Sequence, residues 1–313
     1  MKLCLAILGP TASGKSELAL ELAQALGGEI VCLDSVTVYR HFEIGAAKPA
    51  AVDRKQVPHH LLDIMDPNDE FSAFDFVKRA DATLSEIHNK GKVPIIVGGT
   101  YFYLRALQNG MYPGDKVPPE IVESVENSYV DGEDWLTEKM HADLKAVDPQ
   151  AAEKIHPKDR YRLVRALSLW KHLGTPPSKL QPELISAAQK DRLWMKYAIA
   201  LPRHRLVDRV AARTFKMVEG GLLEETQKLL DQFPKARALS SVGYAEAVAH
   251  LKSGSNDKKA LCNAIIEKTR QLAKRQITWI RSDPEIRFVA PGDIGRIRLE
   301  FNNLKYVLDE EAG

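Results

Sequence analysis

The chain has 313 residues, of which 27% are charged and 44% hydrophobic, and its formal net charge is +2. This is an ordinary globular composition, long enough for one large domain or two moderate ones. A nearly balanced charge excludes a protein that binds nucleic acid over its whole surface, so any such site must depend on local clusters of basic residues.

The cysteines and the lengths of the hydrophobic runs exclude further classes of protein. Cys4, Cys32 and Cys262 form no CxxC pair and their number is odd, so neither a disulfide framework nor a zinc site is expected. No apolar stretch reaches the roughly 18 residues that a transmembrane helix needs, and the first residues lack a signal-peptide pattern. We therefore expect a cytoplasmic protein with no membrane partner.

The chain begins with the pattern of a βαβ unit. Residues 3–8 are a continuous apolar run, which is typical of a strand buried on both faces. Leu18, Leu22 and Leu26 recur at helical spacing and predict a helix that ends at Gly27. Residues 29–33 are again strand-like, so the pattern indicates an α/β fold with a parallel sheet.

The stretch "GPTASGKS" joins the first predicted strand to the first helix and fits G-x-x-x-x-G-K-[ST]. Glycines let several amide N–H groups point at one anion, the lysine adds a charge, and the serine hydroxyl can bind Mg²⁺. The helix N-terminus adds its dipole. We therefore predict a pyrophosphate site formed by Gly9, Thr11, Ala12, Ser13, Gly14, Lys15 and Ser16, with Ser16 as metal ligand and Mg²⁺ as cofactor.

Two further strand ends carry polar residues. The second predicted strand ends at Asp34, and the third, residues 93–97, ends before Gly98, Gly99 and Thr100. Asp34 could bind a metal, act as a general base or cap the next segment, and Thr100 could cap a helix. Because carboxyl ends of parallel strands meet at one edge, both should face the phosphate loop.

The composition changes after Met111. "YPGDKVPPE" is rich in turn residues and indicates a boundary. Helical patterns without intervening strands follow, up to the linker-like "GTPPSKLQPE". We therefore predict an all-helical insertion domain at residues 115–190, with residues 1–114 and 191–313 forming the core.

The last third of the chain returns to the core. Residues 194–201 have strand character, and Pro202 begins a helix that runs to Gly220. The last predicted helix runs from about residue 256 to residue 281. "IRFVAP" is consistent with a final strand, and the tail after Asn302 is weakly informative.

Basic residues recur at helical spacing in three places. The stripes are Lys158, Arg162 and Arg165; Arg205, Arg209 and Arg213; and Arg270, Lys274 and Arg281. One such stripe is usually a solvated face, but three in a nearly neutral chain favour an anionic polymer as partner. Tyr161, Tyr244 and Trp279 could stack on bases, although core packing is the commoner role.

Taken together, the motifs resemble the tRNA dimethylallyltransferases, also called tRNA isopentenyltransferases, of bacterial type. The resemblance covers residues 9 to 281 and is carried by "GPTASGKS", "DSVTVYR", "IGAAKP", "VGGTYFYLRAL", "HPKDRYRLVRAL", "SVGYAEA" and "TRQLAKRQITWIR". It implies an α/β fold with a P-loop NTPase-like parallel sheet core, an all-helical insertion domain and a helical C-terminal part. We also expect a monomer.

The resemblance implies a reaction as well. A dimethylallyl group moves from dimethylallyl pyrophosphate to the exocyclic 6-amino group of the adenosine 3′-adjacent to the anticodon, in tRNAs reading codons that begin with U, and pyrophosphate is released. Asp34 is then the general base, Thr100 helps orient the reacting centre, and Arg209 stabilises the leaving group. Contacts with the tRNA anticodon stem-loop are expected from Asp34, Ser35, Val36, Thr37, Lys158, Asp159, Arg160, Tyr161, Arg162, Ser241, Val242, Gly243, Tyr244, Arg270, Lys274 and Arg275.

Three positions depart from the family pattern. Thr37 stands where many relatives have glutamine, Ala46 where "IGTAKP" is usual, and Tyr101 where glycine or a larger apolar residue is found. Three other functions also fit part of the pattern. They are a small-molecule kinase that uses ATP, an adenylate isopentenyltransferase that prenylates free nucleotides, and a non-catalytic RNA-binding protein.

Overall fold

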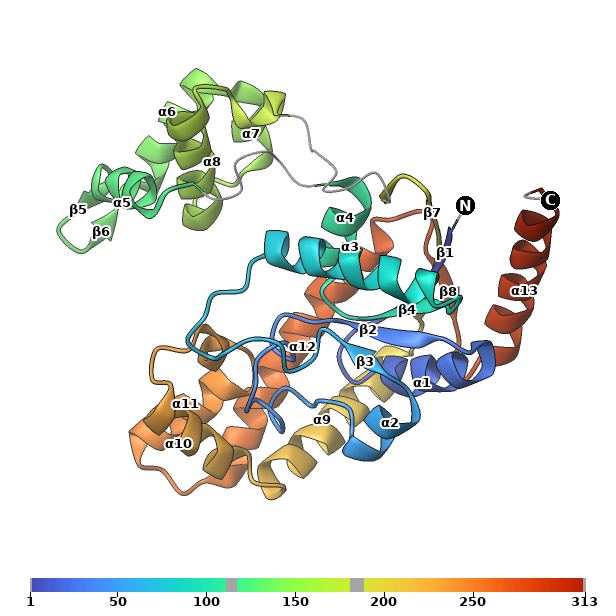
Figure 1. Cartoon of the computed structure of the whole chain (residues 1–313). Coiled ribbons are helices and arrows are strands. Elements are labelled where there is room, and N and C mark those ends of the chain that lie inside the picture. Colours follow the sequence, from blue (N-terminus) through green and yellow to red (C-terminus); the bar gives the residue numbers. More distant parts are fainter. Residues whose placement is uncertain (1, 111–116, 181–188, 312–313) are drawn as a thin grey trace. The chain divides into compact units, whose positions relative to one another are not determined.

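The computed structural model describes residues 2–110, 117–180 and 189–311, and the chain folds into two compact units (Figure 1). Unit 1 comprises Met1–Gln108 and Ser186–Gly313, and unit 2 comprises Asn109–Ile185. The region predicted as linker lies partly outside the described residues.

Unit 1 is built on a six-stranded sheet in the order β3-β2-β4-β1-β7-β8, in which every neighbouring pair is parallel. The strands are β1 (Lys2–Leu8), β2 (Glu29–Leu33), β3 (His59–His60), β4 (Pro94–Gly98), β7 (Arg192–Ile199) and β8 (Arg287–Val289). This confirms the predicted α/β class with a parallel sheet core.

The central strands are hydrophobic because both of their faces are covered. In β1, Leu5 and Ile7 have no exposed surface, and Leu5 is in register with Ile95 of β4 and Met195 of β7. Burial of this kind is what selects uninterrupted apolar runs in parallel sheets. All of these strands therefore end at the same edge, where the phosphate loop begins.

Helices connect the strands of unit 1. They are α1 (Lys15–Leu26), α2 (Ala51–Gln56), α3 (Ala73–Asn89), α4 (Tyr101–Asn109), α9 (Arg203–Glu219), α10 (Leu222–Gln232), α11 (Tyr244–Ser253), α12 (Lys258–Arg281) and α13 (Ile294–Glu311). Helix α3 begins with a capping box, since the Asp75 amide donates to Ser72 Oγ at 3.2 Å and the Ser72 amide donates to Asp75 at 3.0 Å. Such a cap stabilises a helix by about 1 kcal/mol.

The prediction that the last helix ends near residue 281 was wrong, because α13 follows β8. Ile297 and Phe301 of α13 are buried in the main core, and the helix packs beside α1 (Figure 1). Together with the half-buried Leu304 they form a stripe at helical spacing. That stripe is short and is followed by acidic residues, which is why the tail looked uninformative.

Unit 2 consists mainly of helices around its own core. It contains α5 (Pro119–Asn127), β5 (Val130–Asp131), β6 (Asp134–Trp135), α6 (Thr137–Val147), α7 (Pro149–Lys154) and α8 (Arg160–Leu173). Met140, Leu144 and Leu163 are fully buried at its centre.

The prediction of an insertion without strands was wrong, because β5 and β6 form an antiparallel hairpin. Gly132 has a φ of 61° at its turn. The two turn residues are Gly132 and Glu133, and a glycine at the first of them favours a tight hairpin, but the strands are only two residues long and show no alternation. Within the described residues, no helix has the length and hydrophobicity needed to cross a membrane.

Candidate active site

The loop between β1 and α1 is shaped to surround an anion. Gly14 has a φ of 93° and directly precedes the first residue of α1, a backbone conformation that favours glycine. A Cβ atom at Gly9 would overlap the Ser13 hydroxyl, so glycine fits this position without displacing that side chain. The loop thereby leaves the positive end of the α1 dipole at the carboxyl edge of the sheet.

Three cationic side chains converge on this loop. Nζ of Lys15 donates to a backbone carbonyl of the loop at 3.3 Å. From α9, Nη1 of Arg209 donates to the carbonyl of Ser13 at 3.1 Å. One turn further along α9, Nη1 of Arg213 donates to Oγ1 of Thr11 at 2.9 Å. The second basic stripe of the sequence is therefore divided, with two of its arginines committed to the phosphate loop.

The electrostatics of the loop favour a multiply charged anion. Burial, and then the charge of Arg213, lower the pKa of Lys15 to about 8, while Asp34 opposes the shift. Burial also lowers the pKa of Arg213. A bound pyrophosphate would pair with both cations and favour their charged forms.

A pocket of about 390 Å³ opens in front of the loop. The predicted site residues that line it are Thr11, Lys15, Ser16, Asp34, Ser35, Val36, Thr37, Thr100, Ser241, Val242 and Gly243. Gly9, Ala12, Ser13 and Gly14 shape the loop backbone behind it. The pocket thus brings the ends of β1, β2 and β4 together with a loop between α10 and α11.

Asp34 lies at the carboxyl end of β2, and its side chain is held by the turn that follows. Oδ1 accepts hydrogen bonds from the amides of Val36 at 2.7 Å and Thr37 at 3.1 Å. Among the described residues, Oδ2 has no hydrogen-bond partner. One oxygen therefore caps the turn while the other is free to face a substrate, so the capping and general-base interpretations are compatible.

The glycines at the end of β4 allow α12 to approach the phosphate loop. A Cβ atom at Gly98 would overlap the backbone of Leu33, and one at Gly99 would overlap the side chain of Gln276. Oε1 of Gln276 accepts a hydrogen bond from the Thr11 amide at 2.9 Å. The glycine pair before Thr100 therefore lets a side chain of α12 brace the loop.

The donor atoms of the pocket fit Mg²⁺ bound mainly through a substrate. The hydroxyl of Ser16 and the carboxylate of Asp34 both line it, and oxygen ligands of this kind suit Mg²⁺. Within the described residues, no three His, Cys, Asp or Glu side chains are grouped to hold a metal. A hard cation here would take its other ligands from phosphate oxygens and water.

Two tyrosines singled out in the sequence are internal. Tyr244 is fully buried, and its hydroxyl donates to Glu225 at 2.5 Å. Tyr101 is also buried and donates to Asp283 at 2.7 Å. Neither ring is placed to stack on a base in this structure, so the predicted tRNA contact at Tyr244 becomes a packing role. Tyr244 therefore has the commoner of its two expected roles, which is core packing.

The remaining predicted tRNA residues lie outside the pocket. Arg270, Lys274 and Arg275 are exposed on α12. In unit 2, Asp159 caps α8 by accepting from the Arg162 amide at 3.2 Å. Also in unit 2, the guanidinium of Arg160 covers the Trp135 ring at 4.3 Å, Lys158 is exposed, and Tyr161 is 73% exposed.

Three features of the pocket were not predicted from the sequence. Arg213 was recognised only as part of a basic stripe, although its spacing of four from Arg209 was a signal that both could reach one target. Gln276 and residues 45–47 also line the pocket. Their positions depend on contacts across more than a hundred residues of chain, for which periodicity gives no signal.

Comparison with known proteins relates this architecture to enzymes that act on tRNA. The sequence pattern of the family described as IPP transferase matches residues 37–283. A tRNA dimethylallyltransferase 1 of Trichlorobacter lovleyi is 42% identical over 288 residues, which cover 91% of this chain and 93% of the relative. A tRNA dimethylallyltransferase of Myxococcus xanthus is 40% identical, with 91% of each chain covered.

Solved structures are similar over nearly the whole chain. The full-length tRNA isopentenylpyrophosphate transferase of Bacillus halodurans matches with a TM-score of 0.69 and 33% identity, covering 99% of this chain and 98% of that one. A eukaryotic dimethylallyltransferase acting on tRNA matches with a TM-score of 0.77 and 26% identity, covering 94% and 75% of the two chains.

Proposed function

The chain belongs to the IPP transferase family, and on that premise we propose that its pocket transfers a dimethylallyl group from dimethylallyl pyrophosphate to an adenosine of tRNA. The observation that carries the proposal is that Lys15, Arg213 and Asp34 line one pocket. Lys15 and Arg213 lie at the phosphate loop, and Asp34 faces them from the end of β2. A pyrophosphate leaving group and a proton acceptor are the two things this reaction requires.

The phosphate loop supports departure of pyrophosphate. As the bond from carbon to oxygen breaks, negative charge develops on the leaving oxygen, and the loop amides, Lys15 and Arg213 stabilise it. Arg209 stabilises the loop itself by donating a hydrogen bond to the Ser13 carbonyl. Ser16 would hold Mg²⁺, which when bound supplies further neutralisation of that charge.

Asp34 acts on the other reactant. The exocyclic 6-amino group of adenine is a poor nucleophile because its lone pair is delocalised into the ring. As the bond from nitrogen to carbon forms, the amino group loses a proton, and the free oxygen of Asp34 accepts it. The turn amides that hold the other oxygen fix the carboxylate in place. Thr100, at the end of β4, lines the same pocket and helps orient the reacting groups.

The adenosine must leave its stack to enter the pocket, which costs a few kcal/mol. We propose that it is the adenosine 3′-adjacent to the anticodon, in tRNAs that read codons beginning with U. Backbone contacts offset the cost, and Arg270, Lys274 and Arg275 on α12 are exposed for this purpose. The exposed basic residues Lys158 and Arg162 of unit 2 are proposed to contact the same anticodon stem-loop.

A domain division follows from this proposal. Residues 1–114 and 191–313 carry the chemistry, and residues 115–190 serve tRNA binding. That the enzyme works as a monomer in the cytoplasm stays a prediction. A small-molecule kinase with the same loop is not favoured, since the relatives are named as tRNA dimethylallyltransferases.

The test is incubation of the purified chain with dimethylallyl pyrophosphate, Mg²⁺ and unmodified tRNA, followed by mass analysis of the nucleosides. We expect one prenylated adenosine per substrate tRNA and no product when ATP replaces the prenyl donor. Parallel reactions with AMP separate the adenylate isopentenyltransferase alternative, which predicts faster transfer to the free nucleotide. Absence of prenylated adenosine from every tRNA species would exclude the proposal.

A further inference from the structure

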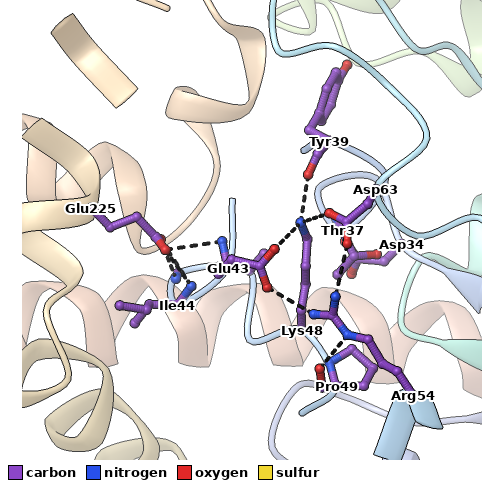
Figure 2. Close-up of polar contacts among 12 residues, drawn as sticks. Asp34, Thr37, Tyr39, Glu43, Ile44, Lys48, Pro49, Arg54, Asp63 and Glu225 are labelled. Atoms are coloured by element: carbon purple, nitrogen blue, oxygen red, sulfur yellow. Dashed lines mark hydrogen bonds and ion pairs between the residues drawn. The ribbon is translucent and has the colours of Figure 1, made fainter. Parts of the chain in front are cut away.

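Four consecutive amide groups, those of residues 43–46, donate hydrogen bonds to two side chains from distant helices. The amide of Ile44 donates to both carboxylate oxygens of Glu225, at 3.1 and 2.8 Å. The amides of Glu43 and Gly45 donate to the same carboxylate at 3.2 and 3.1 Å. Figure 2 shows Glu225 reaching this segment from its own helix, α10. One carboxylate thus gathers three successive backbone donors.

Tyr244 completes the arrangement for the fourth amide. Its hydroxyl donates to Glu225 at 2.5 Å and accepts a hydrogen bond from the Ala46 amide at 3.2 Å. Burial, and then the bond to Glu225, raise the pKa of Tyr244, so the hydroxyl remains a donor. A Cβ atom at Gly45 would overlap the Tyr244 ring. Glu225 and Tyr244 therefore together fix the orientation of residues 43–46 and their distance from helices α10 and α11.

The other end of the segment is held by an ionic cluster. Nζ of Lys48, whose side chain is only 1% exposed, donates to the Tyr39 carbonyl at 2.8 Å, to Glu43 at 3.1 Å and to Asp63. Arg54 contacts Asp63 at 3.0 Å and Glu43 at 2.9 Å (Figure 2). The segment is consequently anchored on both sides and not only by its own backbone.

Hydrogen bonds connect the ionic cluster that anchors this segment to the turn that carries the proposed base, Asp34. The Asp63 amide donates to the Thr37 carbonyl at 3.2 Å, and the Thr37 amide donates to Asp34 at 3.1 Å. Residues 45–47 line the same pocket as Asp34. Glu225 therefore bonds one residue that lines the pocket, Gly45, and the two residues directly before it.

We propose that Glu225 is a positioning residue of the transferase, which together with Tyr244 holds residues 43–46 and thereby keeps residues 45–47, a wall of the pocket, beside Asp34. Its effect on rate rests on the function proposed above, whereas its effect on the segment does not. The carboxylate touches no reacting atom. It acts because only an acceptor with two oxygens satisfies three amides and a hydroxyl at once.

The first test is the variant Glu225→Gln, with Glu224→Gln as matched control. Glutamine retains one acceptor oxygen but turns an NH₂ group toward amide donors, so the segment should come loose. We expect kcat for dimethylallyl transfer to fall at least tenfold, while inorganic pyrophosphate binds with unchanged stoichiometry and within twofold of its normal Kd. Glu224 is exposed on the same helix turn, and its variant should behave as the wild type.

A folded Glu225→Gln enzyme with kcat within twofold of the wild type would overturn the proposal. So would a folded Glu225→Gln enzyme whose pyrophosphate-binding fraction falls in proportion to kcat, because a positioning role leaves that fraction intact. If Glu225→Gln does not fold, Tyr244→Phe decides. It keeps the ring and removes only the hydroxyl, so a severalfold lower kcat with intact pyrophosphate binding supports the proposal. A normal kcat overturns it.

The second test measures amide hydrogen exchange of residues 43–46 in wild-type and variant proteins, without substrates. Exchange at these amides should accelerate at least tenfold in Glu225→Gln, while exchange in α1 stays unchanged. Unchanged exchange at residues 43–46 would overturn the proposal. This measurement decides even if the wild-type chain transfers no dimethylallyl group, so failure of the function and failure of the inference are distinguishable.

Discussion

Two sides of the pocket are built in contrasting ways. The phosphate wall, residues 9–16 with Arg209 and Arg213, is mostly one continuous stretch between a strand and a helix. The acceptor wall, residues 34–37 and 45–47, depends on side chains from elsewhere, above all Lys48 and Glu225, which bonds the amides of residues 43–45. A short motif can specify the first kind of wall, whereas the second depends on the whole fold being assembled. The comparison predicts that the phosphate wall governs donor binding and the acceptor wall governs proton removal and alignment.

The largest effect is expected from breaking the acceptor wall at Asp34. Asparagine keeps an oxygen for the amides of Val36 and Thr37 but cannot take a proton. We expect Asp34→Asn to lower kcat by roughly a hundredfold to ten-thousandfold, the range for general-base catalysis. Single-turnover transfer at saturating tRNA checks this, with the exposed Asp69→Asn as control. A rate within tenfold of the wild type would remove Asp34 from the mechanism.

A smaller effect is expected from weakening the phosphate wall at Arg213. Glutamine removes the charge near the leaving group but retains a hydrogen-bond donor toward Thr11. We expect kcat/KM for dimethylallyl pyrophosphate to fall about a hundredfold, as for loss of one transition-state donor. The KM for tRNA should change less than threefold. Arg205→Gln, on an exposed position of the same helix, provides the matched control, and an equal loss in both variants would refute the assignment.

The pH dependence of donor capture sharpens the contrast between the walls. Lys15 has a pKa lowered to about 8, so in the free enzyme it is charged below this pH and neutral above it. We expect kcat/KM for dimethylallyl pyrophosphate to fall as pH rises through about 8. The corresponding fall in kcat should occur at higher pH, because bound pyrophosphate favours the charged lysine. Stopped assays from pH 6 to 10 measure both profiles. A fall of kcat and of kcat/KM at the same pH would contradict this role of Lys15.

The smallest effect is expected from basic residues that belong to neither wall. Arg270→Ala and Lys274→Ala on α12 should weaken tRNA binding severalfold and leave kcat unchanged. Each removed phosphate contact should reduce the slope of log affinity against log salt by about one. Filter binding at several salt concentrations tests this, with the exposed Lys259→Ala on the same helix as control. An unchanged slope would place these residues outside the tRNA interface.

The same contrast explains how much could be predicted from the sequence. The phosphate wall was predictable because Gly9, Gly14 and Lys15 lie within one short stretch whose chemistry is local. The end of β2 at Asp34 was predictable because a buried strand stops there. The capping box of α3 was likewise visible in the spacing of Ser72 and Asp75, since its two partners are only three residues apart.

What could not be predicted depends on contacts that are distant along the chain. Glu225 meets Ile44 across 181 residues, and Gln276 meets Thr11 across 265. Neither residue stands out by type or spacing, since glutamate and glutamine are common on helix surfaces. The burial of Tyr244 could not be predicted for the same reason. A tyrosine beside basic residues can face RNA or the core, and only the assembled fold places its hydroxyl on Glu225.

The central claim is that the phosphate loop holds a pyrophosphate that departs intact while the carbon end goes to an RNA base. The most direct measurement follows dimethylallyl pyrophosphate labelled separately in its carbon and phosphorus atoms through one turnover with unmodified tRNA. We expect carbon label in a single adenosine of the tRNA and all phosphorus label in free pyrophosphate, in equal amounts. Phosphorus label in the tRNA, or release of inorganic phosphate in place of pyrophosphate, would contradict it.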